Sequence, residues 1–132
     1  ASPQSAAAVI HDLVVELRPL AQRKQQQIDV DVAAGLCWSV PTVVAETILA
    51  NLLLNAIQHG SAGAIVIRAD QQCLTLTNPV AASDTATPGF SLGLELVERL
   101  ATRLGWQVSR SSTATQVKCE LRYAGTPSAP VS

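Results

Sequence analysis

Three polar side chains recur at every fourth position inside an apolar stretch of this 132-residue chain. Asn51, Asn55 and His59 lie in the segment ETILANLLLNAIQHG, residues 46–60. On a helix, a spacing of four places side chains in one column. Two amides in an apolar segment are costly when buried without partners, so they indicate a polar ligand. Surface or helix-capping asparagines are the plainer alternative.

A glycine pair forms the second candidate site. Gly89 and Gly93 begin a segment whose apolar residues recur at helical spacing until Gly105 ends it. Glycines at a helix start allow close backbone approach, and the free N–H groups there attract phosphate. The spacing matches neither the P-loop nor the dinucleotide fingerprint. The order of elements is much stronger evidence of a binding site than the glycines alone. It consists of an asparagine-bearing helix, two strands, a loop and a helix that begins with glycines.

The elements that must position these residues follow from periodicity. Helices are predicted over 6–24, 41–59 and 89–104, and strands over 28–32, 37–40, 64–69, 73–77, 106–110 and 117–123. We expect Pro19 to kink or divide the first helix, and Asn78 and Pro79 to end a strand. Residues 1–5 are predicted to be a loose end, 80–88 a short loop and 124–132 a disordered tail.

Composition restricts the class of protein. A chain of 132 residues, 48% hydrophobic and 14% charged, fits one globular domain. A net charge of −1 without a run of Lys or Arg argues against a nucleic-acid surface. No apolar stretch reaches membrane-spanning length, and the first residues do not resemble a signal peptide. Cys37, Cys73 and Cys119 are expected to lie reduced in the core of a cytoplasmic protein.

Two of these segments resemble motifs of one family. NLLLNAIQHG is similar to the N-box of sensor histidine kinases, and GFSLGLELVERLATRLGW is similar to their second glycine box and following helix. The similarity extends over about residues 8–123. It implies an ATP-binding catalytic domain over residues 6–123, with the Bergerat fold. That fold is an α/β two-layer sandwich in which three helices cover one face of a mixed, mostly antiparallel sheet. Because gyrase-type ATPases share this fold, it does not by itself fix the chemistry.

The resemblance also implies roles for individual residues. Asn51 and Asn55 match the catalytic positions of the N-box, and Asn55 matches the ligand of Mg²⁺. His59 matches a residue that packs against adenine or ribose. Asn78 matches the aspartate that accepts a hydrogen bond from the adenine amino group, and Thr115 the threonine that supports this contact. The nucleotide-binding residues of the second glycine box correspond to Gly89, Phe90, Ser91, Leu92, Gly93 and Leu94.

The chain departs from the family pattern at several of these positions. Gln58 stands where many members have a Lys or Arg that reaches a phosphate, and Asn78 lacks the charge of aspartate. The first glycine box has become NPVAA, residues 78–82, without either glycine, and Ser91 replaces a further glycine. The loop 80–88 offers no basic residue. Weak binding of ATP is therefore expected.

Position 51 bears on the reaction. Related ATPases carry a glutamate there to activate water, and an amide is no general base. A neutral imidazole needs no base, so a histidine kinase requires positioning and metal instead. We therefore expect slow hydrolysis and phosphotransfer to a histidine outside this chain, since His11 is not followed by the acceptor motif.

The resemblance finally implies partners. These are the dimerisation and phosphoacceptor domain of the same kinase and a downstream response regulator, with no nucleic acid. This domain alone would be monomeric, and the full kinase a dimer in the bacterial inner membrane with this part cytoplasmic. The alternative is a degenerate module of the same fold that binds nucleotide weakly and docks a partner. A serine kinase of the anti-sigma-factor type is less favoured.

Overall fold

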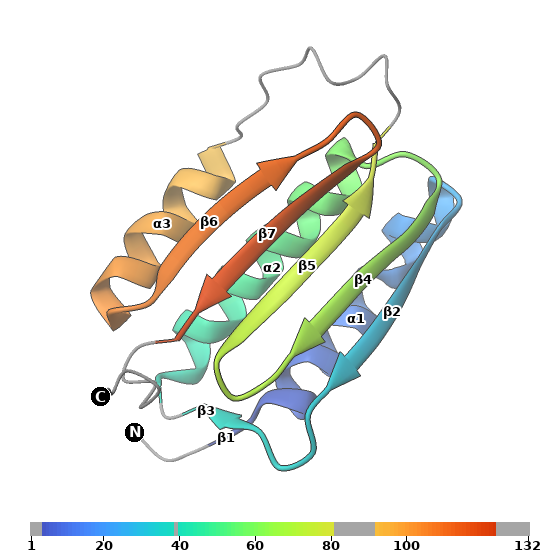
Figure 1. The fold of residues 1–132 in the computed structure, drawn as a ribbon. Coiled ribbons are helices and arrows are strands. Elements are labelled where there is room, and N and C mark those ends of the chain that lie inside the picture. The colour runs from blue at the N-terminus through green and yellow to red at the C-terminus, as the bar shows by residue number, and fades with distance from the viewer. Residues whose placement is uncertain (1–3, 39, 81–91, 124–132) are drawn as a thin grey trace.

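The computed structural model describes residues 4–38, 40–80 and 92–123 (Figure 1). Its three helices are α1 (Ala6–Arg23), α2 (Thr42–His59) and α3 (Leu92–Leu104). All three lie on the same face of the main sheet, with α2 between α1 and α3 (Figure 1). The predicted helices are confirmed, although Pro41 precedes α2 as its N-cap residue instead of standing in the first turn. None of the helices in this described part of the chain is long and apolar enough to cross a membrane.

The main sheet has five strands in the order β2-β4-β5-β7-β6. Their bounds are β2 (Gln26–Val32), β4 (Gly63–Ala69), β5 (Cys73–Pro79), β6 (Gln107–Ser112) and β7 (Gln116–Arg122). β2 and β4 are parallel and the other pairs antiparallel. The predicted two-layer sandwich with a mixed, mostly antiparallel sheet is confirmed. A short antiparallel pair joins β1 (Gln4–Ser5) to β3 (Cys37–Trp38).

The core lies between the helices and the sheet, and α2 forms its centre. The apolar stripe expected on this helix is fully buried, and consists of Ile48, Leu49, Leu52, Leu53 and Ala56. Ile65 and Leu74 meet it from the sheet with no exposed surface. Each such side chain contributes roughly 1.5–3 kcal/mol by leaving water. This burial fixes which face of α2 remains available for a ligand.

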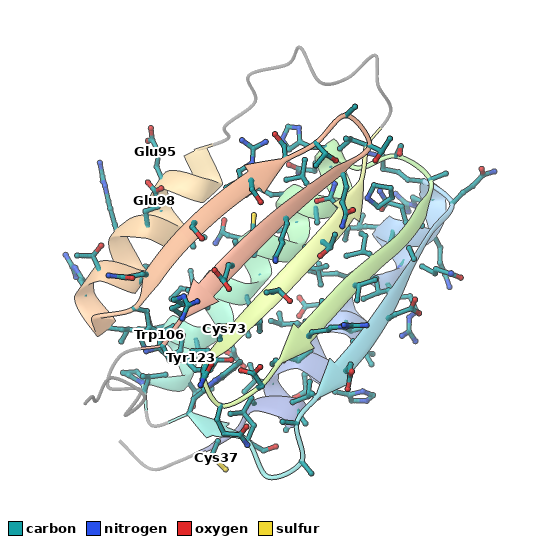
Figure 2. The ribbon with its side chains drawn as sticks, viewed as in Figure 1. Cys37, Cys73, Glu95, Glu98, Trp106 and Tyr123 are labelled. Atoms are coloured by element: carbon teal, nitrogen blue, oxygen red, sulfur yellow. The ribbon has the colours of Figure 1, made fainter. Side chains whose placement is uncertain are left out.

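Three aromatic residues close the core at the end of the sheet where β5 begins. The ring centroids of Trp38 and Trp106 are 6.0 Å apart, and those of Trp106 and Tyr123 are 5.2 Å apart. Figure 2 shows Trp106 and Tyr123 close to Cys73 at this end. Burial raises the pKa of Tyr123 above its ordinary value. The cluster therefore packs β3 against the start of β6 and the end of β7.

Two boundary predictions were wrong because tertiary pairing decides them. Ser5 is not part of a loose end: it pairs with Cys37, and its hydroxyl oxygen accepts a hydrogen bond from the backbone N–H of Ala8, capping α1. Asn78 and Pro79 do not end their strand, since β5 continues through both and pairs with Val117 and Gln116 of β7. The missing N–H of proline does not prevent its carbonyl from accepting a bond.

The structure also differs from two further predictions. Pro19 does not divide α1, which continues through it as one helix. The cysteines are free, as expected, but they do not lie in the core: Cys37 is exposed, and Cys73 and Cys119 are half-buried. The expected tail at residues 124–132 and the loop at 81–88 lie outside the described residues.

The β4–β5 turn is held by the carboxylate of Asp70. It accepts hydrogen bonds from the backbone N–H groups of Gln72 at 2.8 Å and Cys73 at 3.0 Å. The bonds from Cys73 and Gln72, helped by the charge of Arg122, lower the pKa of Asp70 from its usual 3.8. The stability that this turn provides is therefore complete above pH 3.8 and is lost as the pH falls through the lowered pKa.

We expect Asp70→Ala to reduce the acid dependence of stability. Urea unfolding between about pH 2 and 5 should show a smaller loss of stability for the variant than for the wild type. Asp29→Ala, at an exposed position of β2, is the matched control. Identical pH profiles for the wild type and Asp70→Ala would contradict the assignment.

Candidate functional site

The predicted column of polar side chains lies on α2 at the border of its buried stripe. Asn51 and Asn55 are half-buried, and His59 is exposed in the last turn. The amide nitrogen of Asn51 donates to the backbone carbonyl of Thr47 at 2.7 Å. Because the nitrogen is used in that bond, the side-chain oxygen of Asn51 is the atom that can accept a hydrogen bond from a ligand. Gln58 is also exposed, so it can contact a ligand only at the solvent-exposed edge of the site.

Asn78 is a polar residue in the core, with 5% of its surface exposed. Its amide nitrogen donates to the carbonyl oxygen of Pro79 at 3.2 Å. The side-chain oxygen is therefore the end of Asn78 that can accept a hydrogen bond from a ligand. This orientation suits an exocyclic amino group, the group that adenine would present.

The end of α2 is fastened to the end of β5. The backbone N–H of Ser61 donates to the carbonyl of Pro79 at 2.9 Å. A methyl group built on Gly60 would lie 3.1 Å from the amide nitrogen of Asn78, and it would collide with the carbonyl of Ala56. Gly60 therefore permits a close approach that no larger residue allows. We expect this close approach to fix the position of the α2 column relative to Asn78, which Gly60→Ala would test.

Thr115 joins this region through its backbone. Its carbonyl accepts a hydrogen bond from the N–H of Val80 at 3.0 Å, directly after β5. Figure 1 shows that the C-terminal end of α2, the end of β5, the β6–β7 turn and the start of α3 all lie at one end of the domain. The structure thus brings together the α2 column, Asn78 and Thr115.

The second glycine box is described only in part. Gly89, Phe90 and Ser91 lie outside the described residues, whereas Leu92, Gly93 and Leu94 form the first turn of α3. The structure places the start of this helix at the candidate site (Figure 1). A helix N-terminus there can bind phosphate through its free N–H groups.

Two residues at this end were not singled out from the sequence. Lys24 directly follows α1 and Gln26 is the first residue of β2, and both donate hydrogen bonds to carbonyls at the end of α2. The available signal was that Gln26 shares a strand face with Ile28, where alternation favours an apolar residue.

Other parts of the described chain offer less chemistry. No group of three or more His, Cys, Asp and Glu residues within residues 4–38, 40–80 and 92–123 could hold a metal ion. Burial raises the pKa of the Cys119 thiol, and burial together with Asp70 and Glu120 raises that of Cys73. Both thiols are therefore poor nucleophiles. Surface hollows lie along α3, beside Glu95 and Glu98, which Figure 2 shows pointing away from the helix.

Known structures share this architecture. Neither a protein-family model nor a curated protein sequence matches the chain. Its structure superimposes on the cytoplasmic segment of histidine kinase QseC with a TM-score of 0.78 and 14% identity, covering 92% of this chain and 76% of that one. The catalytic domain of histidine kinase ThkA superimposes with a TM-score of 0.76 and 17% sequence identity. That match covers 92% of this chain and 93% of the ThkA domain. Acinetobacter baumannii histidine kinase AdeS superimposes with a TM-score of 0.75 and 18% sequence identity, covering 92% of this chain and 66% of AdeS.

The chain has the fold of a histidine kinase catalytic domain. The architecture implied by the N-box-like and glycine-box-like segments is thereby confirmed. The match to ThkA spans nearly the whole of that catalytic domain. At 14–18% identity the likeness establishes the fold, and the activity must be argued from the site.

Proposed function

We propose that this histidine-kinase-like domain binds ATP with Mg²⁺ and transfers the γ-phosphoryl group to a histidine on a dimerisation domain outside this chain, in two-component signalling. The observation that carries the proposal is the meeting, at one end of the sheet, of the α2 amide column, buried Asn78 and the first turn of α3 (Figure 1). Full-length ShkA, which shares the fold with a TM-score of 0.72 at 17% identity, was solved in complex with AMPPNP. This chain covers 30% of ShkA.

The residues present fit the nucleotide. The oxygen of Asn78 accepts a hydrogen bond from the adenine amino group, while the amide nitrogen stays on Pro79. Asn55 offers a neutral amide oxygen to Mg²⁺, which prefers hard oxygen ligands and keeps several waters. Asn55 would hold the metal, and a bound Mg²⁺ would supply positive charge that offsets the negative charge developing in the transfer. The N–H groups at the start of α3 would donate hydrogen bonds to the phosphates.

The rest of the reaction is positioning. Asn51 cannot act as a base, and its nitrogen is held by Thr47, so it cannot activate water for hydrolysis. The nucleophile is a neutral imidazole from the partner domain, which already carries a lone pair. Transfer therefore depends on holding the γ-phosphoryl group in line with that nitrogen.

A degenerate docking module is the second candidate function. It is favoured by the neutral side chains of Gln58 and Asn78, which remove two charged contacts to the nucleotide. Each such contact is typically worth about 1.5–3 kcal/mol, with the smaller value applying at a solvated site such as that of exposed Gln58.

Calorimetric titration with a non-hydrolysable ATP analogue distinguishes the two candidates. We expect the wild type to bind with a Kd on the order of tens of micromolar to millimolar. Gln58→Lys should tighten binding about tenfold by restoring a charged contact, and Asn78→Asp should tighten it by restoring the charged acceptor. Gln71→Lys, in the exposed β4–β5 turn at the opposite end of the sheet, controls for net charge. Absence of binding at millimolar analogue in all variants would favour the docking module.

A further inference from the structure

A second set of polar groups holds the end of α2 from the side of α1. The ammonium of Lys24 donates to the carbonyl oxygens of Ile57 at 2.7 Å and Gln58 at 2.8 Å. The last carbonyls of a helix have no intrahelical partner, and they carry partial negative charge. Lys24 thus caps α2 with a cation supplied by the neighbouring turn.

Gln26 makes a second attachment to the same end. It is 4% exposed, and its amide nitrogen donates to the carbonyls of Ile57 at 3.2 Å and Ser61 at 3.3 Å. These carbonyls lie on either side of Gly60. The side-chain oxygen of Gln26 is buried and has no hydrogen-bond partner among the described residues. A buried acceptor without a donor is unfavourable, so this oxygen carries a cost that an apolar side chain at position 26 would not have.

The attachment of Gln26 lies directly beside Asn78. Its amide nitrogen and that of Asn78 each lie 3.1 Å from the position of a methyl group built on Gly60. Gln25, between Lys24 and Gln26, is itself held in place, because its carbonyl accepts a hydrogen bond from the N–H of Gly63 at 3.2 Å. Gln25 adopts a φ of 58°, a conformation that a non-glycine residue occupies only at a cost.

We propose that Lys24 and Gln26 form a clamp that fixes the last turn of α2 against Asn78, and that Gln26 is a positioning residue for nucleotide binding. The inference rests on the proposed function. Asn55, one turn before the end of α2, and Asn78 on β5 would contact opposite ends of the nucleotide. The nucleotide binds well only when these two contacts keep a fixed separation. A helix end frays readily, and the clamp removes that freedom before the ligand arrives.

Gln26→Leu tests the inference because its expected effects on stability and on affinity differ. Leucine loses the hydrogen bonds to the carbonyls of Ile57 and Ser61 but also removes the unpartnered buried oxygen, so the melting temperature should fall only slightly. Affinity for the non-hydrolysable ATP analogue with Mg²⁺ should fall about tenfold. Gln27→Leu makes the same change at the next, exposed residue and should leave affinity unaltered.

Lys24 gives a second, independent variant. Its side chain is exposed, so Lys24→Met should fold even if Gln26→Leu does not. We expect Lys24→Met to weaken analogue binding several-fold, Lys24→Arg to retain binding, and the neighbouring Arg23→Met to have no effect. Rescue by arginine would identify the donor to the helix end as the property that matters.

The outcomes separate the inference from the proposed function. If the folded Gln26→Leu and Lys24→Met variants bind the analogue as tightly as the wild type, the clamp has no role in binding and the inference is wrong. If the wild type itself does not bind at millimolar analogue, the proposed function fails, and the inference fails with it. Weakened binding by both variants, with normal binding by both controls, supports the clamp.

Discussion

Replacing Asn55 by alanine is expected to abolish Mg²⁺-dependent phosphotransfer while leaving the fold intact. Asn55 is the protein ligand that the proposed site offers to the metal, so its loss should exceed the roughly 10–100-fold effect of removing an outer-shell partner. The fold should survive because Asn55 is half-buried on a helix whose stripe of leucine and isoleucine carries the packing. Alanine is also the strongest helix former.

The measurement is transfer of labelled phosphate to a supplied dimerisation and phosphoacceptor domain, together with analogue titration with and without Mg²⁺. Thr47→Ala is the matched control, since Thr47 lies two turns earlier in the same column and its hydroxyl donates back to the carbonyl of Val43 at 2.7 Å. The substitution keeps the backbone carbonyl that accepts from Asn51. Normal transfer by a folded Asn55→Ala protein would remove Asn55 from the mechanism.

The sequence was sufficient to predict α2 and its site column. Apolar residues at helical spacing define a stripe, and three polar side chains at intervals of four define a column beside it; both depend only on helical geometry. The stripe is buried, as expected, and the structure places the column at the edge of the stripe. Local periodicity therefore predicted both the helix and the candidate ligand face.

The sequence could not predict where β5 ends. Asn78 and Pro79 are turn residues by local preference, yet pairing with β7 extends the strand through them. The prediction that the cysteines lie in the core was wrong for a related reason. Cys73 directly precedes buried Leu74, but neighbouring strand residues point to opposite faces of the sheet. An apolar neighbour in a strand therefore does not place a cysteine in the core.

The clamp could not be predicted from the sequence, because the residues that it joins are far apart along the chain. Gln26 and Ile57 are 31 positions apart, and Lys24 and Gln58 are 34 apart. In the run of three glutamines at 25–27, alternation with Ile28 places Gln26 on the apolar face of the strand, but it does not indicate which carbonyls its amide contacts. Only the parallel pairing of β2 with β4 brings Gln26 to the end of α2.

Replacing Gly60 by alanine is expected to lower the free energy of unfolding by about 1–3 kcal/mol, the usual cost of overfilling a packed site. The reason is space and not conformation, because Gly60 has a φ of −85°, which every residue adopts. A methyl group there would strike the carbonyl of Ala56 and press on the amides of Asn78 and Gln26. Denaturant unfolding and analogue titration should both show a loss.

Gly35→Ala separates this steric effect from ordinary glycine strain. Gly35 has a φ of 77°, and nothing lies within 4 Å of the methyl position. Alanine there should cost roughly 1–2 kcal/mol through backbone strain alone and should not change analogue affinity, since Gly35 lies in the loop between β2 and β3. If Gly60→Ala behaves like Gly35→Ala and loses stability without affinity, the close approach of α2 to β5 does not set the nucleotide contacts. If it loses both, the fit at Gly60 positions Asn78 relative to Asn55, and the geometry of the binding site depends on a residue that never touches the ligand.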